Sequence, residues 1–188
     1  MLKTLIRSRI QASQKDLGYD MSYGLEILDA DLGAFMRISK LVGISSYRGP
    51  VPDKVAFAVK LVGTLQEDCG PCSQLMVTQA ERAGVAPEVL RAVVSADDAV
   101  LDPEVLLGVL FARASLAREP VADTLREQVK ARWGRRGVIQ LAFGLVAARA
   151  FPTLKYALGF GQTCSRIRIG DKSLAPQHMP AARSSATV

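Results

Sequence analysis

The sequence is poor in the residues that build metal sites and disulfide frameworks. It contains one histidine and three cysteines among its 188 residues. An odd number of cysteines without regular spacing does not fit a disulfide-stapled secreted domain. His178 and Cys164 are both far in sequence from the Cys69/Cys72 pair, so the four ligands of a structural zinc site are not expected to assemble. We expect no metal and no other cofactor.

Long uncharged apolar segments are also missing. The longest, residues 137–148, is shorter than the roughly 20 residues that a membrane-spanning helix needs. Residues 1–15 mix basic side chains with apolar ones, whereas a secretory signal needs an uninterrupted apolar stretch of roughly 7 to 15 residues. We therefore expect a cytoplasmic protein without a membrane partner. In that reducing compartment a cysteine pair is more often catalytic or metal-binding than structural.

Aromatic residues make up only 6% of the chain, so leucine, valine, alanine and isoleucine must build the core. The net charge of +6 is modest. Its densest basic cluster comprises Arg126, Lys130, Arg132, Arg135 and Arg136. We interpret this cluster as a solvated helix face and the turn after it. No nucleic-acid fold signature accompanies it, so no nucleic-acid partner is expected.

Helical periodicity runs through most of the chain, and no segment alternates with the period of a strand. The sequence predicts an all-α, single-domain protein over residues 1–170 and a flexible tail over residues 171–188. Asp53 and Asp102 are candidate helix caps, and Gly134 and Gly137 predict a turn. The predicted helices cover approximately residues 1–15, 25–42, 55–65, 72–83, 87–94, 105–116, 121–133 and 138–151. A further short helix is predicted to begin at Phe151-Pro152 and to end near Gly159 and Gly161.

The residues that carry chemistry are concentrated at Cys69-Gly70-Pro71-Cys72. Positions i and i+3 lie on the same side of the first turn of a helix, so the two sulfurs can form a reversible disulfide or share a metal. Unpaired amide hydrogens and the helix dipole at a helix N-terminus favour a thiolate. The four residues match the active-site tetrapeptide of thioredoxins. They follow a helical stripe here rather than a buried strand, so the thioredoxin fold is not expected.

Two carboxylates, Glu67 and Asp68, directly precede the pair and are the nearest titratable side chains in the sequence. Their negative charge raises the pKa of a neighbouring thiol, whereas a protonated carboxyl can act as a general acid toward a leaving oxygen. A role in ending or capping a helix explains them equally well. We carry both interpretations, with Glu67, Asp68, Cys69 and Cys72 as the candidate catalytic residues.

A helix that leads into Cys-x-x-Cys, which in turn opens a second helix in an all-α chain, resembles the AhpD-like fold. This fold belongs to the carboxymuconolactone decarboxylase and alkylhydroperoxidase D family. The resemblance covers roughly residues 20–165 in architecture, and its specific part is the dithiol. The family glutamate and histidine that relay protons would fall at Phe57 and Met76, which carry no proton. The resemblance therefore implies the dithiol chemistry without the family's relay.

The resemblance implies a thiol–disulfide or peroxide oxidoreductase, and a homo-oligomer such as a dimer, trimer or hexamer. Its expected partners are a small-molecule peroxide or a disulfide-bearing protein. In the family the second cysteine, here Cys72, attacks, whereas in thioredoxin-like exchange the first, here Cys69, does so. The alternative is a non-catalytic helical oligomer, small-molecule-binding or redox-sensing protein on the same scaffold. A decarboxylase has the least support, because no acid–base set is visible.

Overall fold

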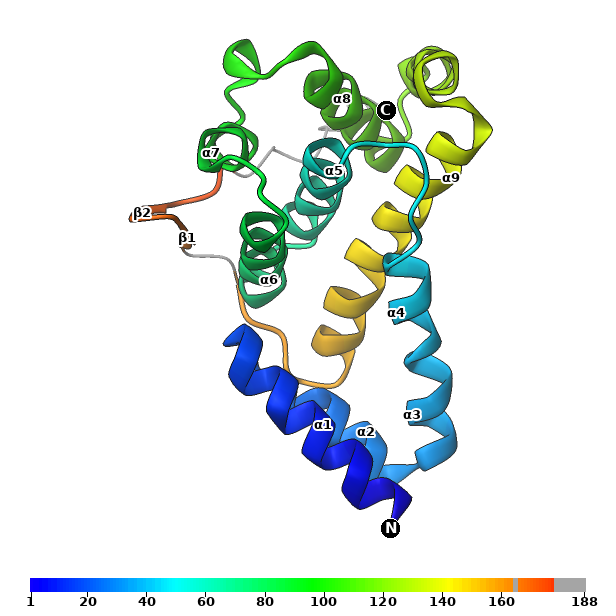
Figure 1. The fold of residues 1–188 in the computed structure, drawn as a ribbon, viewed down its shortest axis with the longest axis vertical. Helices are drawn as coiled ribbons and strands as arrows, with labels where there is room; N and C mark the ends of the chain where they lie inside the picture. The colour runs from blue at the N-terminus through cyan, green and yellow to red at the C-terminus, as the bar shows by residue number, and fades with distance from the viewer. Residues whose placement is uncertain (164–165, 178–188) are drawn as a thin grey trace, which may run out of the picture.

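Helix α5 (Asp53–Gln66) lies at the centre of the molecule, and four helices pack around it (Figure 1). The computed structural model describes residues 1–163 and 166–177. The helices that contact α5 are α6 (Gly70–Arg82), α7 (Pro87–Ser95), α8 (Pro103–Ala117) and α9 (Val121–Ala157). The 3₁₀ turn η1 (Asp98–Val100) links α7 to α8. This set of helices contains most of the apolar core.

The chain begins with an N-terminal arm that we define as α1 (Leu2–Leu17), α2 (Ser22–Ala30), α3 (Leu32–Ile38) and α4 (Lys40–Ser45). In Figure 1 the arm extends from the lower end of the core, and α4 returns along α9, which it contacts. Helix α1 has no buried residue. It is held by ion pairs from Arg7 to Asp29 and from Arg82 to Asp16.

The prediction of a mainly helical chain is confirmed, and several boundaries follow local signals. Asp102 accepts hydrogen bonds from the amides of Glu104 and Val105 and so caps α8. Helix α7 starts at Pro87, where the missing amide hydrogen has no cost. Asp53 is the first residue of α5 rather than its cap, because Pro52 occupies the cap position.

The predicted helix over residues 25–42 is wrong, because the chain forms three short helices there. The side chain of Asp31 accepts hydrogen bonds from the amides of Gly33 and Ala34, which starts α3 and ends α2. Ser39 separates α3 from α4. Neither α3 nor α4 has a buried residue, and Met36 and Val42 of the predicted stripe are exposed.

Helix α9 bends at Gly134, where the predicted turn is confirmed as a kink. Gly134 has φ 68°, a left-handed value that glycine adopts without steric penalty. The predicted separate helix after Pro152 is wrong, because α9 continues through Pro152 to Ala157. Pro152 removes one amide donor near the end of the helix, and the chain continues with helical geometry around it.

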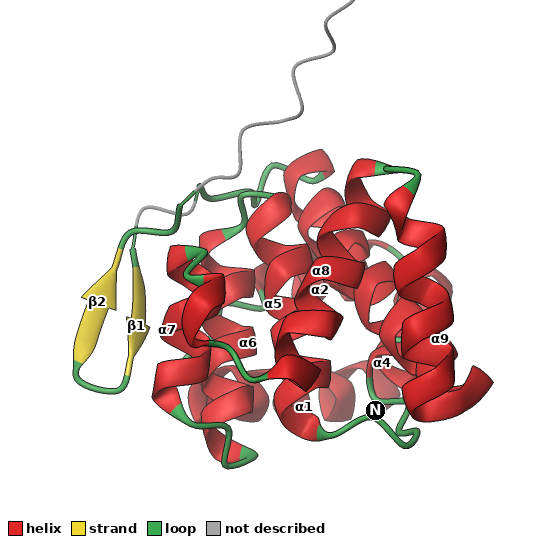
Figure 2. Cartoon of the chain, turned by 90° about the horizontal axis from the view of Figure 1, so that it is seen from above, coloured by secondary structure: helices red, strands yellow, loops and turns green. Residues whose placement is uncertain are grey.

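A short hairpin was not predicted. Strands β1 (Ile167–Ile169) and β2 (Lys172–Leu174) pair antiparallel and lie outside α7 (Figure 2). Ile167 and Ile169 are fully buried, and β1 contacts α6 and α7. Three-residue strands are too short for alternation to stand out in a sequence. Residues 172–174 of the expected tail form β2, and residues 178–188 lie outside the described part.

Within residues 1–163 and 166–177, one helix is long and apolar enough to cross a membrane by length and composition alone. That helix is α9, and 44% of its most apolar window is buried inside the molecule. Core helices of soluble proteins meet the same criterion, so the absence of a membrane partner stays a prediction.

Two glycines allow α5 to approach its neighbours closely. A Cβ added at Gly63 of α5 would lie 2.7 Å from the Cβ of Ala148 in α9. A Cβ added at Gly108 of α8 would lie 2.6 Å from a methyl group of Val55 in α5. Both distances are below normal van der Waals contact, so any side chain at these positions would force the helices apart.

We predict that Gly63→Ala destabilises the protein by about 1–3 kcal/mol, because the added methyl group overpacks the α5–α9 contact. Gly43→Ala is the matched control, since its Cβ would meet no atom within 4 Å and its helix α4 gains helix propensity. Urea-induced unfolding followed by circular dichroism measures both changes. Equal stability of the two variants would show that α5 and α9 are not in tight contact.

Candidate functional site

The two cysteines form a disulfide at the start of α6. Cys69 is the N-cap residue, Cys72 lies in the first turn, and their Cα atoms are 5.3 Å apart. The sulfurs therefore meet as the spacing predicts. Pro71 occupies the first turn, where its lack of an amide hydrogen leaves no helical bond unmade. The exposed fraction is 0% for Cys69 and 4% for Cys72, so the disulfide is buried.

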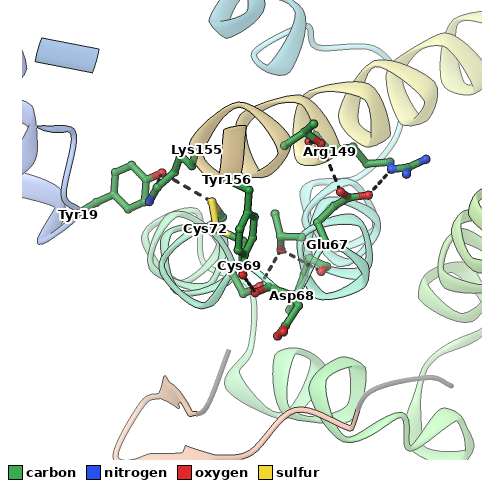
Figure 3. Close-up of a disulfide and its surroundings, with 12 residues drawn as sticks. Tyr19, Glu67, Asp68, Cys69, Cys72, Arg149, Lys155 and Tyr156 are labelled. Atoms are coloured by element: carbon green, nitrogen blue, oxygen red, sulfur yellow. Dashed lines mark hydrogen bonds and ion pairs between the residues drawn. A yellow bond between two sulfur atoms is a disulfide. The ribbon is translucent and has the colours of Figure 1, made fainter. Parts of the chain in front are cut away.

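Cys72 has a polar neighbour that is distant in sequence, Tyr19, and Tyr19 in turn contacts Lys155. The Tyr19 hydroxyl lies 3.7 Å from Cys72 Sγ, and Lys155 Nζ lies 3.5 Å from the Tyr19 hydroxyl. Figure 3 shows Tyr19 reaching Cys72 from the turn after α1, while Lys155 comes from the end of α9. Both side chains are buried, with exposed fractions of 6% and 2%.

Burial shifts the pKa values of these groups. Desolvation raises the pKa of Tyr19, and the negative charges that Tyr23 and Asp20 can carry raise it further. Desolvation lowers the pKa of Lys155, and Asp20 opposes this shift in part. The Lys155 ammonium also lies 4.8 Å from the centre of the Tyr19 ring and 5.6 Å from that of Tyr23, distances typical of cation–π contacts.

A cavity of about 470 Å³ reaches Cys72. Its lining comes from every helix of the N-terminal arm and from α5, α6 and α9, and most of the lining side chains are apolar. Tyr19 and Cys72 both belong to the wall, whereas Cys69 does not. A molecule inside the cavity therefore contacts both Cys72 and Tyr19.

Of the two carboxylates proposed from the sequence, that of Glu67 is engaged with α9. Glu67 forms an ion pair with Arg149 and accepts a hydrogen bond from the Thr153 hydroxyl at 3.3 Å, so it ties the end of α5 to α9. Asp68 adopts φ 49° between α5 and α6. Its backbone carbonyl accepts a hydrogen bond from the Tyr156 hydroxyl at 3.0 Å. Figure 3 shows Glu67 pointing toward Arg149 rather than toward the sulfurs.

The other residues singled out from the sequence take part in packing or in ion pairs, or lie outside the described residues. Phe57 and Met76 are partly buried and pack against the core, and Met76 also lines the cavity. Among the residues that the structure describes, no group of three or more histidine, cysteine, aspartate or glutamate side chains is arranged to hold a metal. Cys164 and His178 lie outside the described residues. In the basic cluster, Arg126 pairs with Asp123, Lys130 with Glu127, and Arg132 with Glu104.

The chain was compared with models of known protein families, with curated proteins and with solved structures. No match was found. The dithiol was accessible to sequence reasoning because it is a local motif. Tyr19 and Lys155 were missed, since neither belongs to a motif and only the fold brings them to Cys72.

We predict that Glu67→Gln lowers the free energy of unfolding by less than about 1 kcal/mol, because the lost ion pair is partly exposed. The rate at which dithiothreitol reduces the Cys69–Cys72 disulfide should stay within about twofold of wild type, since the carboxylate faces Arg149. Arg149→Gln is the matched control and should have the same effect on stability. A large loss of exchange rate in Glu67→Gln alone would restore the acid–base interpretation.

Proposed function

We propose that the protein is a thiol–disulfide oxidoreductase in which the Cys69/Cys72 pair reduces a small-molecule peroxide. The observation that carries this proposal is the position of Cys72 on the wall of a cavity while its disulfide partner Cys69 is fully buried. This arrangement supports a role for Cys72 in meeting the substrate and for Cys69 in resolving the intermediate. An AhpD-like fold and membership of that family are part of the proposal.

The geometry favours Cys72 as the attacking residue. Its thiolate attacks one peroxide oxygen, the O–O bond breaks, and Cys72 becomes a sulfenic acid while the other oxygen leaves with a proton as an alcohol. The Cys69 thiol then attacks Cys72 Sγ, forming the disulfide and releasing water. An external thiol reductant must attack Cys72 from the cavity to restore the dithiol, because Cys69 has no exposed surface.

The burial of both sulfurs also favours a small substrate over a protein disulfide. A protein surface cannot dock against Cys69 and Cys72, which are 0% and 4% exposed, without displacing part of the chain. An organic hydroperoxide with an apolar body suits the apolar lining of the cavity.

A cytoplasmic location and a homo-oligomeric assembly remain predictions of the sequence, and light scattering of the purified protein tests the assembly.

A second candidate is a non-catalytic binder of an apolar molecule whose dithiol senses redox state. The cavity favours it, since about 470 Å³ lies within the usual range of small-molecule sites. Peroxide kinetics distinguish the two candidates, because a binder consumes no substrate.

We predict that Cys72→Ser abolishes peroxide reduction, whereas Cys69→Ser still reacts once and accumulates a sulfenic acid at Cys72. The reason is that Cys72 meets the substrate and Cys69 only resolves the intermediate. Stopped-flow consumption of cumene hydroperoxide and mass spectrometry after dimedone trapping measure these outcomes.

Unchanged consumption in Cys72→Ser would refute this assignment. If wild type reacts no faster than a free model thiol, the protein is not a peroxide reductase. Cys164→Ser controls for the third thiol and should behave as wild type.

We predict that Gly24→Leu slows the reduction of cumene hydroperoxide about tenfold more than that of hydrogen peroxide. Gly24 lines the cavity, and a Cβ there would meet no atom within 4 Å, so the added side chain has room to occupy the cavity. Gly43→Leu is the control, because its position is equally open but does not line the cavity. Equal slowing of both peroxides would mean that the bulky substrate does not use this cavity.

A further inference from the structure

Lys155 is a basic residue whose side chain is almost completely buried. Its side chain is 2% exposed, and among the described residues no carboxylate lies within ion-pair distance of Nζ. The nearest acidic influence is that of Asp20, which acts on Lys155 at longer range. Its polar contact is the Tyr19 hydroxyl, and the rings of Tyr19 and Tyr23 lie around the ammonium. A buried ammonium is unfavourable unless nearby groups compensate it.

In the disulfide form the hydrogen bonds from Lys155 through Tyr19 run toward Cys72, and Tyr23 is a competing acceptor for the Tyr19 proton. An ammonium group can only donate, so the Tyr19 oxygen accepts from Lys155. A disulfide sulfur carries no proton, so the Tyr19 hydroxyl donates to Cys72 Sγ. The Lys155 proton therefore points toward Tyr19, and in this contact the Tyr19 proton points toward Cys72. Electron density that builds up on this sulfur, or on an atom bonded to it, meets a donor that is already oriented.

We propose that Tyr19 and Lys155 form the proton-donating pair of Cys72, stabilising its thiolate and protonating the oxygen that leaves when the peroxide is cleaved. This inference rests on the proposed function and names the groups that supply its proton. Phe57 and Met76 cannot take that role, because neither side chain carries a transferable proton.

The proton balance follows the chain of contacts. When the Cys72 thiolate attacks the hydroperoxide, the O–O electron pair leaves on the distal oxygen as an alkoxide. The alkoxide takes the Tyr19 proton, and the tyrosinate takes a proton from the Lys155 ammonium. After the alcohol leaves, the neutral amine regains its proton through Tyr19, which lines the cavity and can take a proton from water there. The external thiol supplies the two electrons that return the disulfide to the dithiol.

Burial prepares both groups for these steps. Desolvation lowers the pKa of Lys155, so its ammonium releases a proton more readily than an exposed lysine does. Desolvation raises the pKa of Tyr19, so its hydroxyl is a weaker acid than usual and gives up its proton only to a strong base such as the alkoxide. Tyr23 and Asp20 are the other titratable groups that act on this pair.

We predict that Lys155→Met, in a Cys69→Ser background, raises the pKa of the Cys72 thiol by roughly one unit because a nearby cation is lost. Alkylation of Cys72 by iodoacetamide near pH 7 should then slow about tenfold. The measurement is the pH profile of alkylation, resolved by peptide mass spectrometry so that Cys164 does not contribute. Lys155→Arg keeps the charge and should stay within about threefold of the parent.

Tyr19→Phe removes only the hydroxyl and should slow peroxide reduction by on the order of 100-fold, because the leaving oxygen loses its acid. Tyr47→Phe is the matched control, since Tyr47 packs against Phe143 and does not line the cavity.

Lys155→Met should keep or raise the melting temperature, because it removes a buried charge. Circular dichroism of each variant separates loss of function from loss of fold.

Two results are decisive and differ in what they overturn. If folded Tyr19→Phe keeps the peroxide rate and the Cys72 pKa within twofold of wild type, the pair is structural and this inference is wrong, while the dithiol function stands. If wild type itself reduces no hydroperoxide, the proposed function fails and the protonation step fails with it. The alkylation profile then still reports whether Lys155 and Tyr19 stabilise the Cys72 thiolate.

Discussion

The close contact between α5 and α9 sets the geometry of the site. With no side chain at Gly63, α9 can lie directly against α5 at Ala148. Lys155 follows Ala148 by roughly two helical turns and so returns to the same side of α9. Cys69 lies just beyond the end of α5 in the same direction. A small change in the spacing of these two helices therefore moves the ammonium relative to the sulfurs, although neither group takes part in the contact.

How much the sequence predicts depends on whether a feature is local. The helices of the core and the cap at Asp102 follow from spacing and from short-range hydrogen bonds, and the dithiol is a four-residue motif. Asp31 shows the limit of periodicity, because its side chain ends one helix and starts the next without disturbing the apolar pattern. Tyr19 and Lys155 have no local signal, since their contacts with the site depend on how α1, α6 and α9 pack.

The site keeps a charged group where an apolar one would pack more favourably. Methionine has a similar length to lysine and needs no compensation in an apolar environment, whereas an ammonium loses its hydration there. Two aromatic rings and one hydroxyl offset part of that loss for Lys155. Functional sites commonly keep such unfavourable groups at the expense of stability. By contrast, Glu67 makes an ordinary partly exposed ion pair that links two helices.

The contacts around Cys72 also span most of the chain. The Tyr19–Cys72 contact joins residues 53 positions apart, and the Lys155–Tyr19 contact joins residues 136 positions apart. A dithiol in a fragment or in a partly folded chain has the same four residues but none of these neighbours. Under the proposed function, the reactivity of Cys72 is therefore a property of the completed tertiary structure rather than of the four-residue motif.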